Sequence, residues 1–122
     1  MFKDFLLVGL GGGIGSMLRY GGNLLIAHKN FPLHTLIINI VGSFIIGIVF
    51  GLSVKHEVFA GNWKLFLATG ICGGFTTFSA FSMENISLLQ HGKYTLAVVY
   101  IISSLVLGIA AAAIGFKIFN TN

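Results

Sequence analysis

Apolar residues fill this chain in four long segments that are separated by short polar connections. Residues 30–54, 65–83 and 94–116 contain no charged side chain, and residues 5–27 contain only Arg19. An α-helix needs roughly 20 mostly apolar residues to cross the hydrocarbon core of a bilayer, and each segment is close to that length. The pattern therefore predicts four transmembrane helices, at about residues 5–27, 35–54, 63–90 and 94–117.

Composition indicates an all-α integral membrane protein, with residues 1–122 forming a single transmembrane domain. Hydrophobic residues make up 56% of the chain and charged residues 8%, and the mean hydropathy is +0.96, whereas soluble domains carry about 25% charged residues. The short connections leave no room for an aqueous active site, and no catalytic triad, metal-ligand cluster or phosphate-binding loop can be assembled. We therefore expect a transport or structural membrane protein and not an enzyme.

The lysines are nearly balanced between the two sides of the membrane. An even number of spans places both termini on one side, so the lysines divide into a group of four and a group of two: Lys3, Lys55, Lys64 and Lys117 against Lys29 and Lys93. This weak bias permits insertion in both orientations, and without an internal inverted repeat two chains must supply the inversion. The net charge of +4 is scattered and forms no basic patch, so we expect no nucleic-acid partner.

Small or polar residues recur at every fourth position in the first two segments. The series are Gly11, Gly15, Arg19 and Asn23, then Thr35, Asn39, Ser43, Gly47 and Gly51. Such spacing lets helix backbones pack closely in lipid. Arg19 and Asn39 are more than packing residues, because a cation or an amide at membrane depth is costly unless it faces protein or a watery cavity. Arg19 either snorkels to the interface or forms a structural pair, or it attracts an anion. Asn39 either bonds a neighbouring helix or lines an ion path.

The densest polar signal within a span is GICGGFTTFSAFS at residues 70–82. Its paired glycines weaken a helix, and the hydroxyls that follow can divert backbone hydrogen bonds to side chains. We therefore expect an interruption of the third helix, which is tolerated at membrane depth only beside protein or a water-filled cavity. Phenylalanines spaced by three either pack in a core or line that cavity: Phe75, Phe78 and Phe81.

Three motifs occur in order along the chain: GGGIGSMLRY, TLIINIVGSFIIG and GICGGFTTFSAFS. Together they resemble the CrcB/Fluc family of fluoride channels over essentially the whole sequence. The resemblance implies a multi-pass protein of a bacterial-type inner cell membrane that lets fluoride leave passively and so gives resistance to fluoride toxicity. It also implies an antiparallel, dual-topology homodimer with two pores and a structural sodium ion.

Residue roles follow from the same resemblance. It implies that Gly73 and Thr76 supply backbone carbonyls to sodium, that Phe78 and Phe81 line the pores, and that Asn39 contacts the anion path. It matches Arg19 to the family's first-helix arginine, and Tyr100 and Ser104 to a polar track on the fourth helix. Gly108 departs from that track, because a further hydroxyl is expected there, and Ala80 is a smaller departure.

The residues favour anion permeation on chemical grounds as well. Fluoride is strongly hydrated, so a pore must replace the donors of water without holding the ion too tightly. The chain offers neutral donors in its spans: Asn39, Thr77, Ser79, Tyr100 and Ser104. The positive edge of a phenylalanine ring can also face an anion, and no dense ring of cations is present to trap it.

Two other functions fit part of the sequence. A small multidrug-type proton-coupled exporter can share the four-helix, dual-topology design, but it needs a carboxylate at the membrane midplane, and Glu84 near the end of the third helix is too peripheral. A structural membrane subunit accounts for the glycine series but not for the interrupted phenylalanine segment.

Overall fold

The structure is a computed structural model that describes residues 1–26, 31–57 and 60–120. Three long helices are continuous: α1 (Phe2–Leu25), α2 (Leu33–Lys55) and α6 (Tyr94–Asn120). The remaining apolar segment is divided into α3 (Asn62–Lys64), the π-helix η2 (Leu65–Cys72), α4 (Gly73–Phe75) and α5 (Phe78–Gln90). The described residues form helices and no strand, which confirms the all-α fold.

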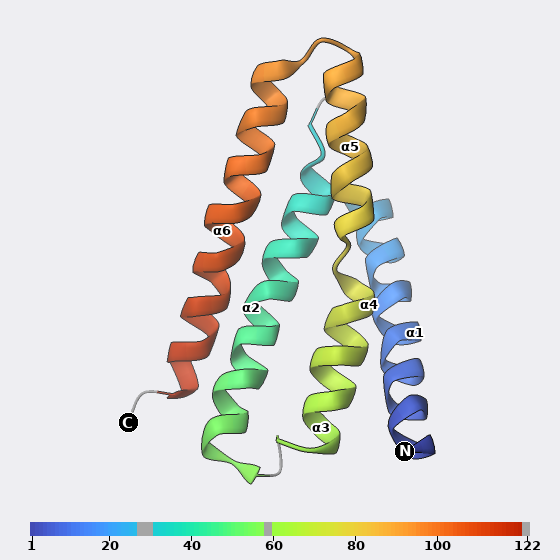
Figure 1. Cartoon of the computed structure of the whole chain (residues 1–122), viewed down its shortest axis with the longest axis vertical. Coiled ribbons are helices and arrows are strands. Elements are labelled where there is room, and N and C mark those ends of the chain that lie inside the picture. Colours follow the sequence, from blue (N-terminus) through green and yellow to red (C-terminus); the bar gives the residue numbers. More distant parts are fainter. Residues whose placement is uncertain (27–30, 58–59, 121–122) are drawn as a thin grey trace.

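The helices lie side by side, with α2 between α6 and the divided third segment, and with α1 against the other side of that segment (Figure 1). The predicted helix limits agree with the observed ones within a few residues, and residue 27 lies outside the described residues. Among the described residues, three segments are long and apolar enough to cross a membrane: Leu33–Lys55, Asn62–Gln90 and Tyr94–Phe119. The glycines and charged residues of α1 lower its hydropathy, so its role as a fourth span stays a prediction.

Glycines bring α1 into backbone contact with the third segment. A Cβ atom on Gly11 would lie 2.6 Å from the carbonyl oxygen of Phe66, and one on Gly15 would overlap the carbonyl oxygen of Ile71. On the opposite side, a Cβ atom on Gly74 would overlap the carbonyl oxygen of Gly12. The close packing predicted from the four-residue spacing is therefore confirmed at Gly11 and Gly15.

Glycines also allow the backbones of α2 and α6 to approach closely. Cβ atoms on Gly47 and Gly51 would overlap the carbonyl oxygens of Ala112 and Phe116, and one on Gly115 would overlap that of Phe44. These contacts fix the register of the two helices, which both run from the top of Figure 1 towards the bottom. Positions 39 and 43 of α2 consequently lie level with the region of α6 around positions 104 and 108.

The predicted interruption of the third segment is present, but it lies at the threonines rather than at the glycines. Thr76 and Thr77 are extended, with φ/ψ of −82°/158° and −150°/119°, whereas Gly73 is helical. Gly74 lies against α1, where a Cβ atom would overlap the carbonyl oxygen of Gly12. The helix ends only where side chains begin to take over the backbone hydrogen bonds.

Candidate functional site

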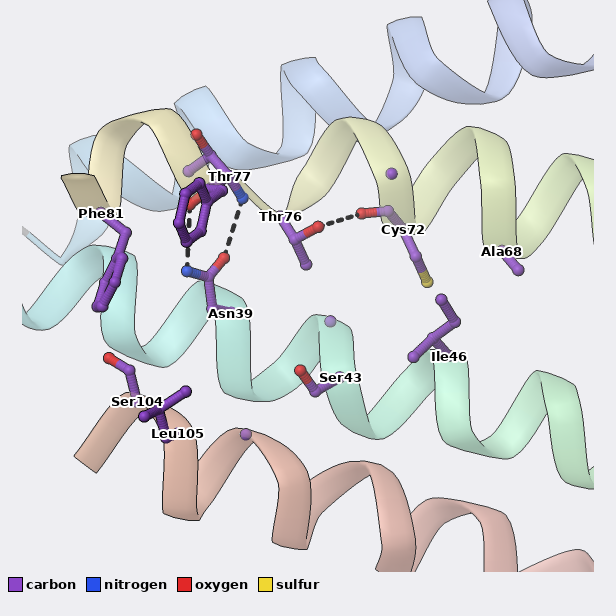
Figure 2. Close-up of a pocket in the computed structure, with 14 residues that line it drawn as sticks. Asn39, Ser43, Ile46, Ala68, Cys72, Thr76, Thr77, Phe81, Ser104 and Leu105 are labelled. Atoms are coloured by element: carbon purple, nitrogen blue, oxygen red, sulfur yellow. Dashed lines mark hydrogen bonds between the residues drawn. The ribbon is translucent and has the colours of Figure 1, made fainter. Parts of the chain in front are cut away.

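A cavity of about 360 Å³ lies beside the interruption, between α2, the third segment and α6 (Figure 2). Most of the predicted site residues line it: Asn39, Gly73, Thr76, Thr77, Phe78, Phe81 and Ser104. Other lining residues were not predicted as part of a site: Gly42, Ser43, Ile46, Ala68, Cys72, Leu105 and Gly108. Within the described part of the chain, no charged residue belongs to this lining, so the site is neutral.

Asn39 holds the interrupted backbone in place. The backbone N–H of Thr77 donates to Asn39 Oδ1 over 3.0 Å, and Asn39 Nδ2 donates to the carbonyl oxygen of Thr77 over 3.3 Å (Figure 2). One amide side chain thus bonds both backbone groups of Thr77 and replaces the helical partner of its N–H. This is the interhelical hydrogen bond expected as one alternative for Asn39, and contact with an anion stays a prediction.

The two threonines lie between α4 and α5, and their hydroxyls bond the backbone at the two helix ends. Thr77 caps α5, because its hydroxyl accepts from the backbone N–H of Ala80 over 3.2 Å, and it also lies 3.3 Å from the hydroxyl of Ser79. Thr76 donates its hydroxyl to the carbonyl oxygen of Cys72 over 2.9 Å. Ser79 is exposed and does not line the cavity, so its predicted place in an anion path stays untested.

The carbonyl oxygens of Gly73 and Thr76 are suited to a cation. Among the described residues, no hydrogen bond is found to either oxygen. In a continuous helix the backbone N–H of Thr77 would donate to the carbonyl oxygen of Gly73, but here it donates to Asn39. Both carbonyls lie at the end of α4, and the carboxyl end of a helix favours positive charge. Freed carbonyls of an interrupted membrane helix can coordinate sodium, so the residues present fit the predicted ion.

Arg19 lies at the same helix end but outside the cavity lining. Its Nε donates to the carbonyl oxygen of Gly74 over 3.1 Å, which links α1 to α4. A cation that binds a free carbonyl at a helix end is stabilising. This is the structural pair expected as one alternative for Arg19, and its role towards an anion stays a prediction.

Aromatic rings border one end of the cavity. The ring centroids of Phe78 and Phe81 are 5.7 Å apart, and those of Phe81 and Tyr100 are 5.0 Å apart. Phe78 is 78% exposed, Phe81 is half-buried, and Tyr100 is fully buried. Phe81 therefore contacts the buried ring of Tyr100 on one side and the exposed ring of Phe78 on the other, and both phenylalanines line the cavity.

Two hydroxyls face the cavity without a partner. Ser104 Oγ is buried and makes no hydrogen bond, and none is found for Ser43, which lines the cavity from α2. A buried polar atom without a partner is costly. Both hydroxyls are therefore available to a polar ligand that enters the cavity.

A hydrogen-bonded cluster around Glu84 was not predicted. The Glu84 carboxylate accepts from the hydroxyls of Thr35 and Tyr100, each over 2.7 Å, and lies 3.2 Å from His34 Nε2. The hydroxyl of Tyr100 thus turns to Glu84, and Tyr100 is absent from the cavity lining. A sequence signal existed, because Glu84 continues the spacing of three set by Phe78 and Phe81. His34 lies in the first turn of α2, which begins at Leu33, two residues before the predicted helix at 35–54.

Comparison with known proteins identifies the family. A family model described as "CrcB-like protein, Camphor Resistance (CrcB)" matches residues 6–116. A protein of Azobacteroides pseudotrichonymphae is 48% identical over 119 residues, which cover 95% of either chain. A protein of Thermus thermophilus is 44% identical over 119 residues, covering 95% of this chain and 94% of its own. One of Pyrococcus abyssi is 41% identical over 115 residues, covering 93% of this chain and 94% of its own. All three are named "Fluoride-specific ion channel FluC". The chain belongs to the CrcB-like family.

Proposed function

We propose that this protein is a fluoride channel that lets the ion leave the cell passively and so gives resistance to fluoride. The names of the relatives support the ion and the channel activity. The structural observation that carries the proposal is the neutral cavity beside the interrupted helix, with the unpartnered hydroxyl of Ser104 in its wall. As a member of a channel family, the chain is not an enzyme.

The chemistry of the lining suits a small anion in transit. Hydroxyl groups can replace part of the hydration shell of fluoride, and the positive edges of phenylalanine rings add a weaker attraction. Arg19 is bound to Gly74 and lies outside the lining. No charged side chain of the described residues belongs to the lining. A neutral site of this kind binds an anion weakly enough to release it.

A second copy of the chain in the opposite orientation completes the proposed channel. Phe78 borders the cavity and yet is 78% exposed in the single chain, so a partner surface is needed to enclose the path. The near balance of lysines supports insertion in both orientations. Two identical chains related by a twofold axis contain two equivalent cavities and therefore two pores.

Sodium is proposed as a structural ion at the interrupted helices. The carbonyl oxygens of Gly73 and Thr76 would hold it, and two chains would supply four such oxygens. The ion would provide a fixed positive charge between the two interruptions. Arg19 and Asn39 prepare this arrangement without touching the ion, since they hold the neighbouring backbone at Gly74 and Thr77.

The proton-coupled exporter finds no support in these observations. Such a carrier exchanges protons at a carboxylate that faces its substrate, but Glu84 is outside the cavity lining and is engaged by Thr35, Tyr100 and His34. A purely structural subunit does not account for the cavity with its free hydroxyls.

Growth of a cell that lacks its own fluoride export tests the proposal. Expression of this chain should restore growth in medium that contains fluoride, and fluoride loss from the cells should not depend on an imposed pH gradient. Fluoride loss that requires a proton gradient would favour the exporter instead.

A further inference from the structure

Ser43 and Ser104 line the cavity, and their hydroxyls lack the bond to their own helix that two other serines of this protein make. Serines in membrane helices usually bond a carbonyl of their own helix. Ser53 does so with Phe50 over 2.7 Å, and Ser82 does so with Phe78 over 3.0 Å. Across the described ranges, Ser104 Oγ is buried without a hydrogen-bond partner, and no hydrogen bond is found for the hydroxyl of Ser43, which is half-buried. Both residues line the cavity.

The register of α2 and α6 places Ser43 opposite a position that has no side chain. A Cβ atom built on Gly108 would lie 3.8 Å from Ser43 Oγ, which is an ordinary van der Waals distance. Gly108 follows Ser104 by four residues on α6, and Ser43 follows Asn39 by four residues on α2. The lining thus continues one helical turn beyond Ser104, and the polar group at that level comes from α2 (Figure 2).

We infer that Ser43 is a further anion-contacting residue of the channel, and that its hydroxyl supplies the donor that α6 lacks at Gly108. The inference rests on the proposed function. A fluoride ion leaving Ser104 meets Gly42, Ile46, Leu105 and Gly108 at the next level, and none of their side chains can donate a hydrogen bond. Thr76 also lines this level, but its hydroxyl donates to the carbonyl oxygen of Cys72. Ser43 therefore offers the hydroxyl that remains free to donate.

The test compares fluoride efflux from liposomes that contain the wild type, Ser43→Ala, Ser43→Thr or the double variant Ser43→Ala, Gly108→Ser. Ser43→Ala should lower the efflux about tenfold, which corresponds to roughly 1.4 kcal/mol. Ser43→Thr keeps the hydroxyl and should retain most of the efflux. The double variant moves the hydroxyl across to α6, where the 3.8 Å gap admits it, and should recover efflux relative to Ser43→Ala.

The matched control is Ser53→Ala on the same helix, because Ser53 lies outside the cavity lining and should leave the efflux unchanged. Thermal unfolding separates ion contact from a structural role. A hydroxyl without a protein partner adds no stability, so Ser43→Ala should unfold at no lower temperature than the wild type.

The inference is overturned if Ser43→Ala conducts as the wild type does, if it unfolds earlier or fails to fold, or if neither Ser43→Thr nor the double variant conducts better than Ser43→Ala. Absence of fluoride efflux from the folded wild type would instead refute the proposed function itself.

Discussion

Replacing Phe78 or Phe81 by isoleucine separates a role in the anion path from a role in packing. Isoleucine keeps apolar bulk but removes the electropositive ring edge. The two positions differ in burial, since Phe78 is 78% exposed whereas Phe81 is half-buried and lies 5.0 Å from the ring of Tyr100. If both rings only packed, the two substitutions would therefore have unequal effects on stability and none on permeation.

The expected magnitudes follow from these contacts. Phe81→Ile loses an aromatic pair worth about 0.5–1.5 kcal/mol and changes the shape of a packed site at a cost of about 1–3 kcal/mol. Phe78→Ile should change the free energy of unfolding of the single chain by less than about 0.5 kcal/mol, as is usual for exposed positions. If each ring edge contributes about 1–2 kcal/mol to the anion in transit, either substitution lowers fluoride efflux roughly 5- to 30-fold.

The assay pairs fluoride efflux from liposomes with thermal unfolding of the same purified variants. Phe5→Ile is the matched control, because Phe5 is 69% exposed on α1 and lies outside the cavity lining. It should leave both measurements unchanged. Normal efflux through folded Phe78→Ile and Phe81→Ile would refute the assignment of these rings to the path and return them to packing.

Three further predictions concern the scaffold around the cavity. Gly15→Ala should lower the free energy of unfolding by about 1–3 kcal/mol, because its Cβ atom would overlap the carbonyl oxygen of Ile71; equal thermal stability would contradict the observed packing of α1. Asn39→Ala should cost about 1–3 kcal/mol for each unpaired backbone group of Thr77, and urea unfolding that matches the wild type would show that the two bonds do not hold the interruption. Replacing sodium by a bulky organic cation should weaken both the dimer, measured by its dissociation on dilution, and fluoride efflux; if neither changes, the carbonyls of Gly73 and Thr76 do not bind sodium.

The sequence was sufficient for the elements that depend on local pattern. Long apolar runs predicted the helices, four-residue spacing of glycines predicted the close contacts of Gly11 and Gly15, and the run of hydroxyls predicted the interruption. These features depend on neighbouring residues in the sequence: the period of the helix, the size of glycine and the competition of side-chain hydroxyls for backbone hydrogen bonds.

Features that depend on register between helices could not be predicted. The interruption lies at Thr77 because Asn39, 38 residues earlier, takes its backbone hydrogen bonds. The π-helix of η2 leaves no distinct pattern in the sequence. Ser43 appeared only as one member of a packing series, and its place in the cavity wall follows from the packing of α2 on α6. The partners of Glu84 could not be predicted, because Thr35 and Tyr100 lie on two other helices.

Selective fluoride efflux from liposomes tests the central claim most directly. Liposomes that contain the purified wild-type protein are loaded with equal concentrations of potassium fluoride and potassium chloride, and a potassium ionophore is added to release the counter-ion. Ion-selective electrodes then follow both anions in the external solution. A passive fluoride channel predicts rapid fluoride release, without an imposed pH gradient, and chloride release no faster than from protein-free liposomes. Fluoride release at the protein-free rate from folded protein, or equal release of the two anions, would contradict the account.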